Sequence, residues 1–241
     1  MNECISYNRI VSPYYAVVML FWISAVFLLV NLGYHNSFLF LNQHHSPLLD
    51  LIVPHLTHVG DSLILSSLVL IFLSPRNLPL AFTIVVSILL SGLVLVSLKH
   101  FVFSDWHRPL KALGENAGIH FVRGHVEYNK AFPSGHTTTI FSAFPLIAYL
   151  FRQKIIQIFI AIAAILFGYT RIYLGSHFLG DVLAGSVLGT SFAVISLSFI
   201  YPRLKGLLSS KVEKTKGRIQ IIAFWVAMAG LVIGVLIRYV L

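Results

Sequence analysis

Long apolar runs constrain the fold of this chain more than any other feature. A helix needs about 20 mostly apolar residues to cross the hydrocarbon core of a membrane. Seven segments approach or reach that length: residues 14–32, 62–73, 80–98, 137–151, 155–172, 178–201 and 219–240. Only 10% of the residues are charged, against about 25% in soluble domains, so the chain cannot cover a water-facing surface. We expect an all-α fold: a polytopic transmembrane helix bundle with six core spans and a seventh C-terminal segment.

The basic residues divide the chain further. Residues 1–201 are expected to form a six-helix membrane core, residues 202–218 a basic cytoplasmic linker, and residues 219–241 an additional helix that spans the membrane or lies in its interface. The linker contains Arg203, Lys205, Lys211, Lys214, Lys216 and Arg218. Such a juxtamembrane cluster attracts anionic lipid. The net charge of +9 does not indicate nucleic-acid binding, because no recognised reader motif accompanies it.

The same residues predict the orientation. Lys and Arg are enriched in cytoplasmic loops, and Arg9, Arg76, Arg152 and the linker all fall on one side of the predicted bundle. The connection formed by residues 34–61 contains no Lys or Arg and is therefore placed outside. The third connection is also outside, yet it is basic at Arg108, Lys111, Arg123 and Lys130. Basic residues on the disfavoured side call for a functional explanation.

Three polar clusters are predicted to meet at the outer ends of the helices. They are Lys99 with Arg108-Pro109, then Pro133-Ser134-Gly135-His136, then Thr170-Arg171 followed by His177 and Asp181. Ser134 stands at a predicted helix N-cap, where backbone N–H groups without partners bind anions. Gly135 lets an anion approach the backbone, with His136 at the rim. Alone, a helix cap beside an interfacial histidine explains this tetrapeptide without any chemistry.

His177 and Asp181 are four residues apart and so share one face of a predicted helix. A carboxylate can hold one imidazole nitrogen and leave the other as a nucleophile or base. The alternative is a helix-end pair that only satisfies itself. Arg171 and Arg108 can bind phosphate oxygens bidentately, and Lys99 can act as a point charge, although snorkelling explains each cation singly. Convergence at one membrane edge favours a phosphate site.

With these residues the chain resembles the type 2 phosphatidic acid phosphatase superfamily, which also includes vanadium haloperoxidases and glucose-6-phosphatase, and in it the bacterial membrane lipid phosphatases. The family pattern is Lys, six residues, Arg-Pro; then Pro-Ser-Gly-His; then Ser-Arg, five residues, His, three residues, Asp. The second part matches in full, and the third differs only at Thr170, which keeps a hydroxyl. In the first part, eight residues instead of six separate Lys99 from Arg108.

The resemblance implies a mechanism and a site. His177 would attack phosphorus and form a phosphohistidine, Asp181 would hold its ring, and His136 would protonate the leaving group and then activate water. The phosphoryl oxygens would be held by Lys99, Arg108, Ser134, Gly135 and Arg171. With three cations, the family's site works with no metal and no cofactor.

The substrate implied by the family is a membrane phospholipid, isoprenoid or lipid A phosphate. Candidates are undecaprenyl pyrophosphate, lipid A phosphates, phosphatidic acid and phosphatidylglycerol phosphate, hydrolysed at the outer (periplasmic) face of a bacterial inner membrane. A lipid-to-lipid phosphotransferase on the same scaffold is an alternative, and so is a non-catalytic lipid transporter or binding protein. The outer histidines His44, His45, His55 and His58 lack a regular metal-ligand spacing and are interpreted as interfacial.

Overall fold

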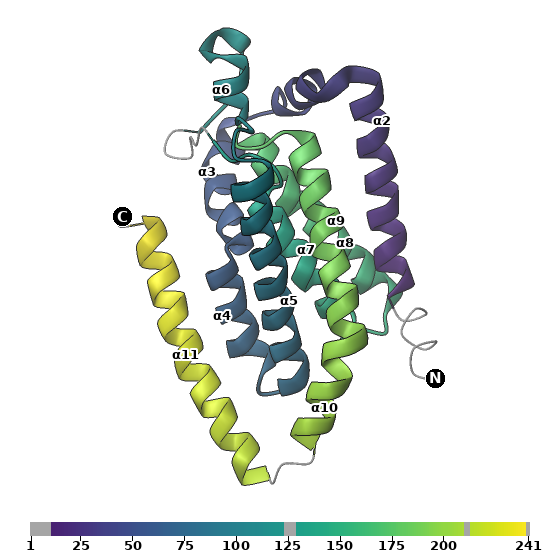
Figure 1. Ribbon diagram of the computed structural model, residues 1–241, viewed down its shortest axis with the longest axis vertical. Helices are drawn as coiled ribbons and strands as arrows, with labels where there is room; N and C mark the ends of the chain where they lie inside the picture. The colour runs from purple at the N-terminus through teal and green to yellow at the C-terminus, as the bar shows by residue number, and fades with distance from the viewer. Residues whose placement is uncertain (1–10, 123–128, 210–212, 240–241) are drawn as a thin grey trace.

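The computed structural model describes residues 11–122, 129–209 and 213–239, and over these ranges the chain is helical with no strand. The long helices run side by side as one bundle (Figure 1). In chain order the elements are α2 (Ser12–Asn42), α3 (Pro47–Leu56), η1 (Thr57–Gly60), α4 (Ser62–Leu73), α5 (Leu78–Ser97), η2 (Leu98–Val102), α6 (Pro109–Leu113), η3 (Glu115–Ala117), α7 (Gly135–Ala148), α8 (Lys154–Tyr173), α9 (Leu179–Ile195), η4 (Ser196–Ile200), α10 (Tyr201–Ser209) and α11 (Glu213–Tyr239). The predicted all-α membrane bundle is confirmed.

All seven predicted apolar segments are helices, but they do not all have the length of a span. Among the described residues, five helices are long and apolar enough to cross a membrane, or up to six if one bent pair counts as a single span. The bent pair is Pro47–Gly60 with Ser62–Leu73, which meet at 73°. The difference from the predicted seven lies in two short helices. α7 has 14 residues and falls short of the roughly 20 needed, and α4 has 12 residues and reaches that length only as part of the bent pair.

The first span is interrupted at Gly33, directly after the predicted end of the first apolar segment at residue 32. Gly33 has φ +79 and ψ 173 inside α2, and the helix resumes after it and continues to Asn42. A positive φ is strained for residues with a side chain and open to glycine. The break turns the last part of α2 across the outer end of the bundle (Figure 1), which brings Tyr34 over the start of α9.

α7 is the central helix, in contact with α5, α8 and α9. Its tightest contact is with α9, where two glycines face it. A Cβ on Gly185 would lie 2.6 Å from the backbone oxygen of Ser134, and one on Gly189 would overlap the backbone of Thr138 and Phe141. Small residues at this spacing let two membrane helices approach backbone to backbone. The two helices that carry the second and third motifs are therefore held together directly.

The end of the bundle opposite α6 gathers the α4–α5 turn, α10 and the start of α11 (Figure 1). The stretch predicted to be a linker is helical over most of its described length, since α10 extends to Ser209 and α11 begins at Glu213. α11 packs against α4, and residues 215–237 of it are long and apolar enough to span.

Candidate active site

The three sequence motifs meet at one end of the bundle. Lys99 lies in η2 directly after α5, Ser134 precedes α7, and His177 lies in the turn between α8 and α9. The backbone N–H of Ser134 donates to the backbone oxygen of Asp181 at 3.0 Å, which ties the start of α7 to the start of α9. Residues from three separate stretches between positions 99 and 181 are thus brought into one site, as the motif pattern predicted.

His177 and Asp181 form a buried pair. The Nδ1 atom of His177 lies 3.1 Å from Oδ2 of Asp181, and the two side chains are 2% and 0% exposed. The carboxylate also accepts the backbone N–H of Phe178 at 3.0 Å. Because a carboxylate can only accept, Nδ1 carries the proton of the neutral ring and Nε2 holds the lone pair.

The pair differs from the prediction in one detail. His177 lies in the turn before α9, with Phe178 at the N-cap, instead of on the helix face itself. The turn is fixed from the other side, because the backbone N–H groups of Ser176 and His177 both donate to the backbone oxygen of Arg171, at 3.0 and 3.1 Å. Asp181 in the first turn of α9 then reaches back to the ring.

Two arginines are buried beside this pair. Arg108, 5% exposed, directs one terminal nitrogen to Nε2 of His177 at 3.3 Å and to the backbone oxygen of Ser176 at 3.2 Å. Its Nε donates to the backbone oxygen of Asn129 at 3.0 Å. Arg171, 4% exposed, donates to Oγ1 of Thr57 at 2.8 Å. In these contacts the guanidinium groups meet neutral oxygens and a ring nitrogen, and their positive charge acts on His177.

Lys99 belongs to the same site in spite of its wider spacing from Arg108. It lies half-buried in η2, a π-helical turn in which the N–H of Phe103 donates to the oxygen of Leu98 at 2.8 Å. A π turn accommodates an extra residue relative to an α-helix, and residues 103–108 form the rest of the connection. The positive charge of Lys99 acts on His177 and helps to lower the pKa of that histidine.

The pKa of His177 is well below its ordinary value. Burial is the main cause, and the charges of Arg108, Lys99, Arg171 and His136 add to it. Both effects disfavour the protonated ring. The imidazole is therefore neutral at physiological pH, with Nε2 available as an electron-pair donor.

The Pro-Ser-Gly-His segment opens α7 as predicted, but its serine does not cap the helix with its side chain. Ser134 occupies the N-cap position and is fully buried; its hydroxyl accepts from Oγ1 of Thr137 at 2.9 Å. Gly135 is open, since a Cβ there would meet nothing closer than a Leu95 methyl at 3.5 Å. His136 is half-buried and packs against Gly60, whose Cβ would lie 2.9 Å from that of His136.

Gly135 and His136 line a cavity of about 510 Å³. Most of its remaining wall is apolar and comes from α5, including Ile88, Leu89 and Leu95, with Gly60 and Asp61 at the start of α4. The cavity places apolar space next to the histidine that opens α7. A ligand with both a polar group and an apolar chain fits such a boundary.

Motif spacing did not reveal Tyr34, Trp106 or Thr57. The hydroxyl of Tyr34 donates to Oδ1 of Asp181 and accepts the indole N–H of Trp106 at 3.2 Å. The Tyr34 ring packs on Phe178 with centroids 4.8 Å apart. Gly33 in an apolar run was the only local signal of a break here, and nothing in the sequence linked residue 34 to residue 181.

The outer histidines form no metal site among the described residues. His45 stacks on His120 with centroids 4.0 Å apart, and Nε2 of His120 lies 2.8 Å from Oδ1 of Asp50. Asn42 joins this cluster to α8 through the backbone oxygens of Ile172 and Tyr173 at 2.9 and 3.2 Å. The cluster connects α2, α3 and α8 at the outer end. Of the basic residues noted in the third connection, Arg123 lies outside the described residues.

The fold is that of a polytopic membrane protein, and its candidate active site is a buried histidine–aspartate pair beside a cluster of cations. A profile of the PAP2 superfamily matches residues 80–205, which include all three motifs. The chain belongs to the PAP2 superfamily.

The chain is also similar to individual proteins of known function and to a solved structure. The chain is 35% identical to the lipid A 4'-phosphatase of Bacteroides thetaiotaomicron, over 38% of this chain and 40% of that protein. It is 38% identical to phosphatidylglycerophosphatase B of Bacillus subtilis, over 26% of this chain and 36% of that protein. The crystal structure of Aquifex aeolicus LpxE superposes with a TM-score of 0.60 and 30% identity, covering 67% of this chain and 93% of that one. The matches with the two curated relatives span well under half of each relative's length.

Proposed function

We propose that this protein is a membrane phosphatase that hydrolyses a lipid phosphate or pyrophosphate through a phosphohistidine on His177. The observation that carries the proposal is the neutral, buried imidazole held between Asp181 at Nδ1 and Arg108 at Nε2. Asp181 fixes the ring at Nδ1 and leaves the lone pair on Nε2 beside Arg108. Arg108 attracts phosphate oxygens, so a bound phosphate would bring its phosphorus atom next to Nε2 for attack.

In the first half-reaction, a bond forms between Nε2 of His177 and phosphorus, and the bond from phosphorus to the leaving oxygen breaks. His136 gives that oxygen its proton. Asp181 stabilises the positive charge that the ring acquires. Lys99, Arg108 and Arg171 neutralise the phosphoryl oxygens, with the hydroxyl of Ser134 and the backbone N–H of Gly135 as further donors.

In the second half-reaction, His136 takes a proton from water. The water oxygen attacks phosphorus, the nitrogen–phosphorus bond breaks, and inorganic phosphate leaves. Charge stabilisation comes from the three cationic side chains, so we expect turnover without a metal or any other cofactor.

A lipid substrate is supported by the apolar cavity beside His136 and by the relatives named for lipid A and for phosphatidylglycerophosphate. We infer that the substrate is a lipid A phosphate, phosphatidylglycerol phosphate, phosphatidic acid or undecaprenyl pyrophosphate. Its phosphate would enter among Lys99, Arg108 and Arg171, and its apolar part would lie along α5.

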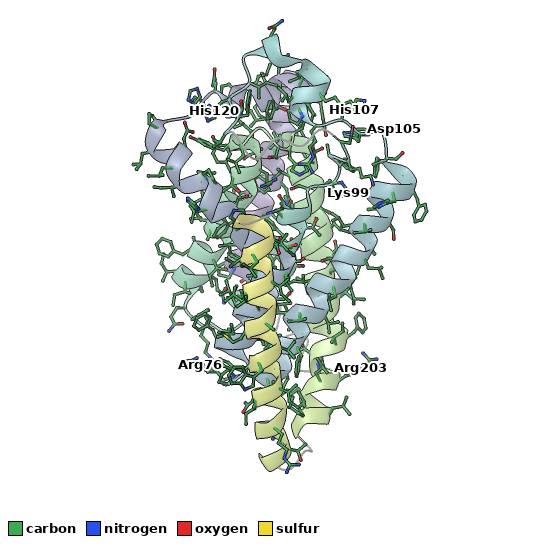
Figure 2. All side chains as sticks on the ribbon, turned by 90° about the vertical axis from the view of Figure 1, so that its left-hand side faces the viewer. Arg76, Lys99, Asp105, His107, His120 and Arg203 are labelled. Atoms are coloured by element: carbon green, nitrogen blue, oxygen red, sulfur yellow. The ribbon has the colours of Figure 1, made fainter. Side chains whose placement is uncertain are left out.

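We further propose that the site faces the periplasm from a bacterial inner membrane. The basic residues at Arg76 and in residues 202–218 support this orientation, as does the position of Arg76 and Arg203 at the end of the bundle opposite Lys99 (Figure 2). In this arrangement residues 1–201 are the catalytic core, residues 202–218 contact anionic lipid, and residues 219–241 add a span. Reporter fusions after Glu127 and after Lys214 should lie on opposite sides of the membrane. The same side for both would refute the orientation.

Phosphate release by the purified protein in detergent tests the reaction. Wild type should release inorganic phosphate from a panel of the four lipid classes in the presence of EDTA. His177→Ala should abolish release, whereas the matched variant His44→Ala, at an exposed outer histidine, should retain it. Near-normal rates in His177→Ala would refute the nucleophile. Restoration of EDTA-treated protein only by Mg²⁺ would refute metal independence. Transfer of labelled phosphate to a second lipid would identify a phosphotransferase instead.

A further inference from the structure

A second, smaller cavity lies at the end of the bundle opposite His177. It encloses about 270 Å³ between the α4–α5 turn, α10 and α11. The residues that matter for its chemistry are Arg76, Asn77, Lys205, Leu208, Lys216 and Gln220. In Figure 2 the labelled Arg76 lies on this end, far from the labelled Lys99.

Three separate elements each contribute one cation to this cavity. Arg76 comes from the α4–α5 turn, Lys205 from α10 and Lys216 from α11, and none of the lining residues is acidic. Arg76 and Lys205 are exposed and Lys216 is half-buried, and like charges that line one cavity repel one another even where water screens them. An arrangement of this kind is favourable when an anion occupies the space between the charges.

Two hydrogen bonds to neutral partners fix the walls of the cavity. A terminal nitrogen of Arg76 donates to the backbone oxygen of Phe72 at 2.9 Å. The amide of Gln220 donates to the backbone oxygen of Ser74 at 3.1 Å, which fastens α11 to the end of α4. Both partners are neutral carbonyl groups, so these two hydrogen bonds add no negative charge to the cavity.

We propose that this cavity binds the phosphate group of an anionic phospholipid from the leaflet on that side of the membrane. A guanidinium group and two ammonium groups match the several oxygens of a phosphodiester, and the amides of Asn77 and Gln220 add neutral donors. Leu208 gives the cavity an apolar wall where the glycerol backbone would lie. The volume accommodates a headgroup and not a whole lipid. The inference rests on the proposed contact of residues 202–218 with anionic lipid, which it makes specific, and not on the proposed enzymatic activity.

Such a lipid would join three elements that belong to different parts of the chain. α11 packs on α4, and the phosphate would link it to α10 and the α4–α5 turn as well. Binding to the folded state alone raises its stability. Anionic lipid should therefore stabilise the protein against heat, with Arg76, Lys205 and Lys216 as the residues responsible.

Thermal unfolding of the full chain in a neutral detergent tests this inference. Phosphatidylglycerol should raise the unfolding midpoint by roughly 5 °C at saturation, and phosphatidylcholine should not. The triple variant Arg76→Gln/Lys205→Gln/Lys216→Gln should lose the shift. The matched variant Arg152→Gln/Lys154→Gln/Arg203→Gln removes three exposed cations that do not line the cavity, and it should retain the shift.

Each result decides a separate point. An equal shift in the triple variant and wild type, no shift in wild type, or an equal loss in both variants would overturn the site. A full shift with inorganic phosphate, lost in the triple variant, would support the site and make free phosphate the source of the ligand. If the triple variant does not fold, the double variant Lys205→Gln/Lys216→Gln replaces it, and native mass spectrometry counts the phosphatidylglycerol retained. Equal retention by the double variant and wild type would overturn the proposal.

Discussion

Replacing Tyr34 by phenylalanine removes one hydroxyl from the site and leaves the ring in place. The hydroxyl donates to Oδ1 of Asp181, while Oδ2 serves His177 and the backbone of Phe178. The ring itself packs on Phe178 and against Gly180, and these contacts survive the substitution. The substitution therefore tests the hydrogen bond from Tyr34 to Asp181 alone, the carboxylate that orients the proposed nucleophile.

The size of the effect follows from the kind of bond that is lost. A hydrogen bond to a charged group contributes about 1.5–3 kcal/mol, and each 1.36 kcal/mol in a barrier is tenfold in rate. His177 becomes positive as it attacks phosphorus, so a looser Asp181 costs more in the transition state than in the ground state. We expect kcat to fall roughly 10- to 100-fold with KM nearly unchanged.

The assay measures kcat and KM for the lipid phosphate that wild type hydrolyses, together with the unfolding temperature. Tyr169→Phe is the control, because it loses a hydroxyl bonded to the backbone oxygen of Leu41 at 3.0 Å and not to Asp181. Trp106→Phe should add little to Tyr34→Phe, since the indole acts through the same hydroxyl. A kcat for Tyr34→Phe within twofold of an active wild type, or an equal loss in Tyr169→Phe, would refute the reasoning.

Two further predictions concern stability. Gly185→Ala places a methyl group 2.6 Å from the backbone oxygen of Ser134 and should cost about 1–3 kcal/mol; Gly206→Ala, with no atom within 4 Å, is the control, and equal unfolding temperatures would contradict the packing argument. As pH falls below about 6.5, the unfolded chain protonates His177 while burial and the neighbouring cations keep it neutral in the fold. Wild type should therefore lose about 1.4 kcal/mol more than His177→Gln between pH 7.5 and 5.5; parallel pH curves from thermal unfolding would contradict this sign.

The sequence was sufficient for the helices and for the motif residues. Apolar runs such as residues 80–98 and 155–172 predict α5 and α8 because a membrane imposes one length and one composition on a span. The histidine–aspartate spacing likewise predicts contact, since four residues make one helical turn. Both signals are local. The helices are confirmed, and the two side chains do meet, although His177 lies in the turn before α9 and not in the helix that the spacing assumed.

Contacts across the chain were not predictable in the same way. Tyr34 and Asp181 meet because Gly33 breaks α2, and a single glycine in an apolar run does not specify which way the chain turns. Thr57 meets Arg171 because residues 47–60 fold into α3 and η1, where the sequence predicted only a connection. The tertiary arrangement of the helices, and not their local pattern, places these partners.

The backbone bond between Ser134 and Asp181 bears on how the protein is made. Synthesis proceeds from the N-terminus, so the cationic residues at 99 and 108 and the histidine at 136 are translated well before His177. Until α9 is synthesised and inserted, the nascent chain carries the cations that attract phosphate but lacks the proposed nucleophile. The proposed active site is therefore completed only when α9 joins the bundle, which is also the step that completes the packing around α7.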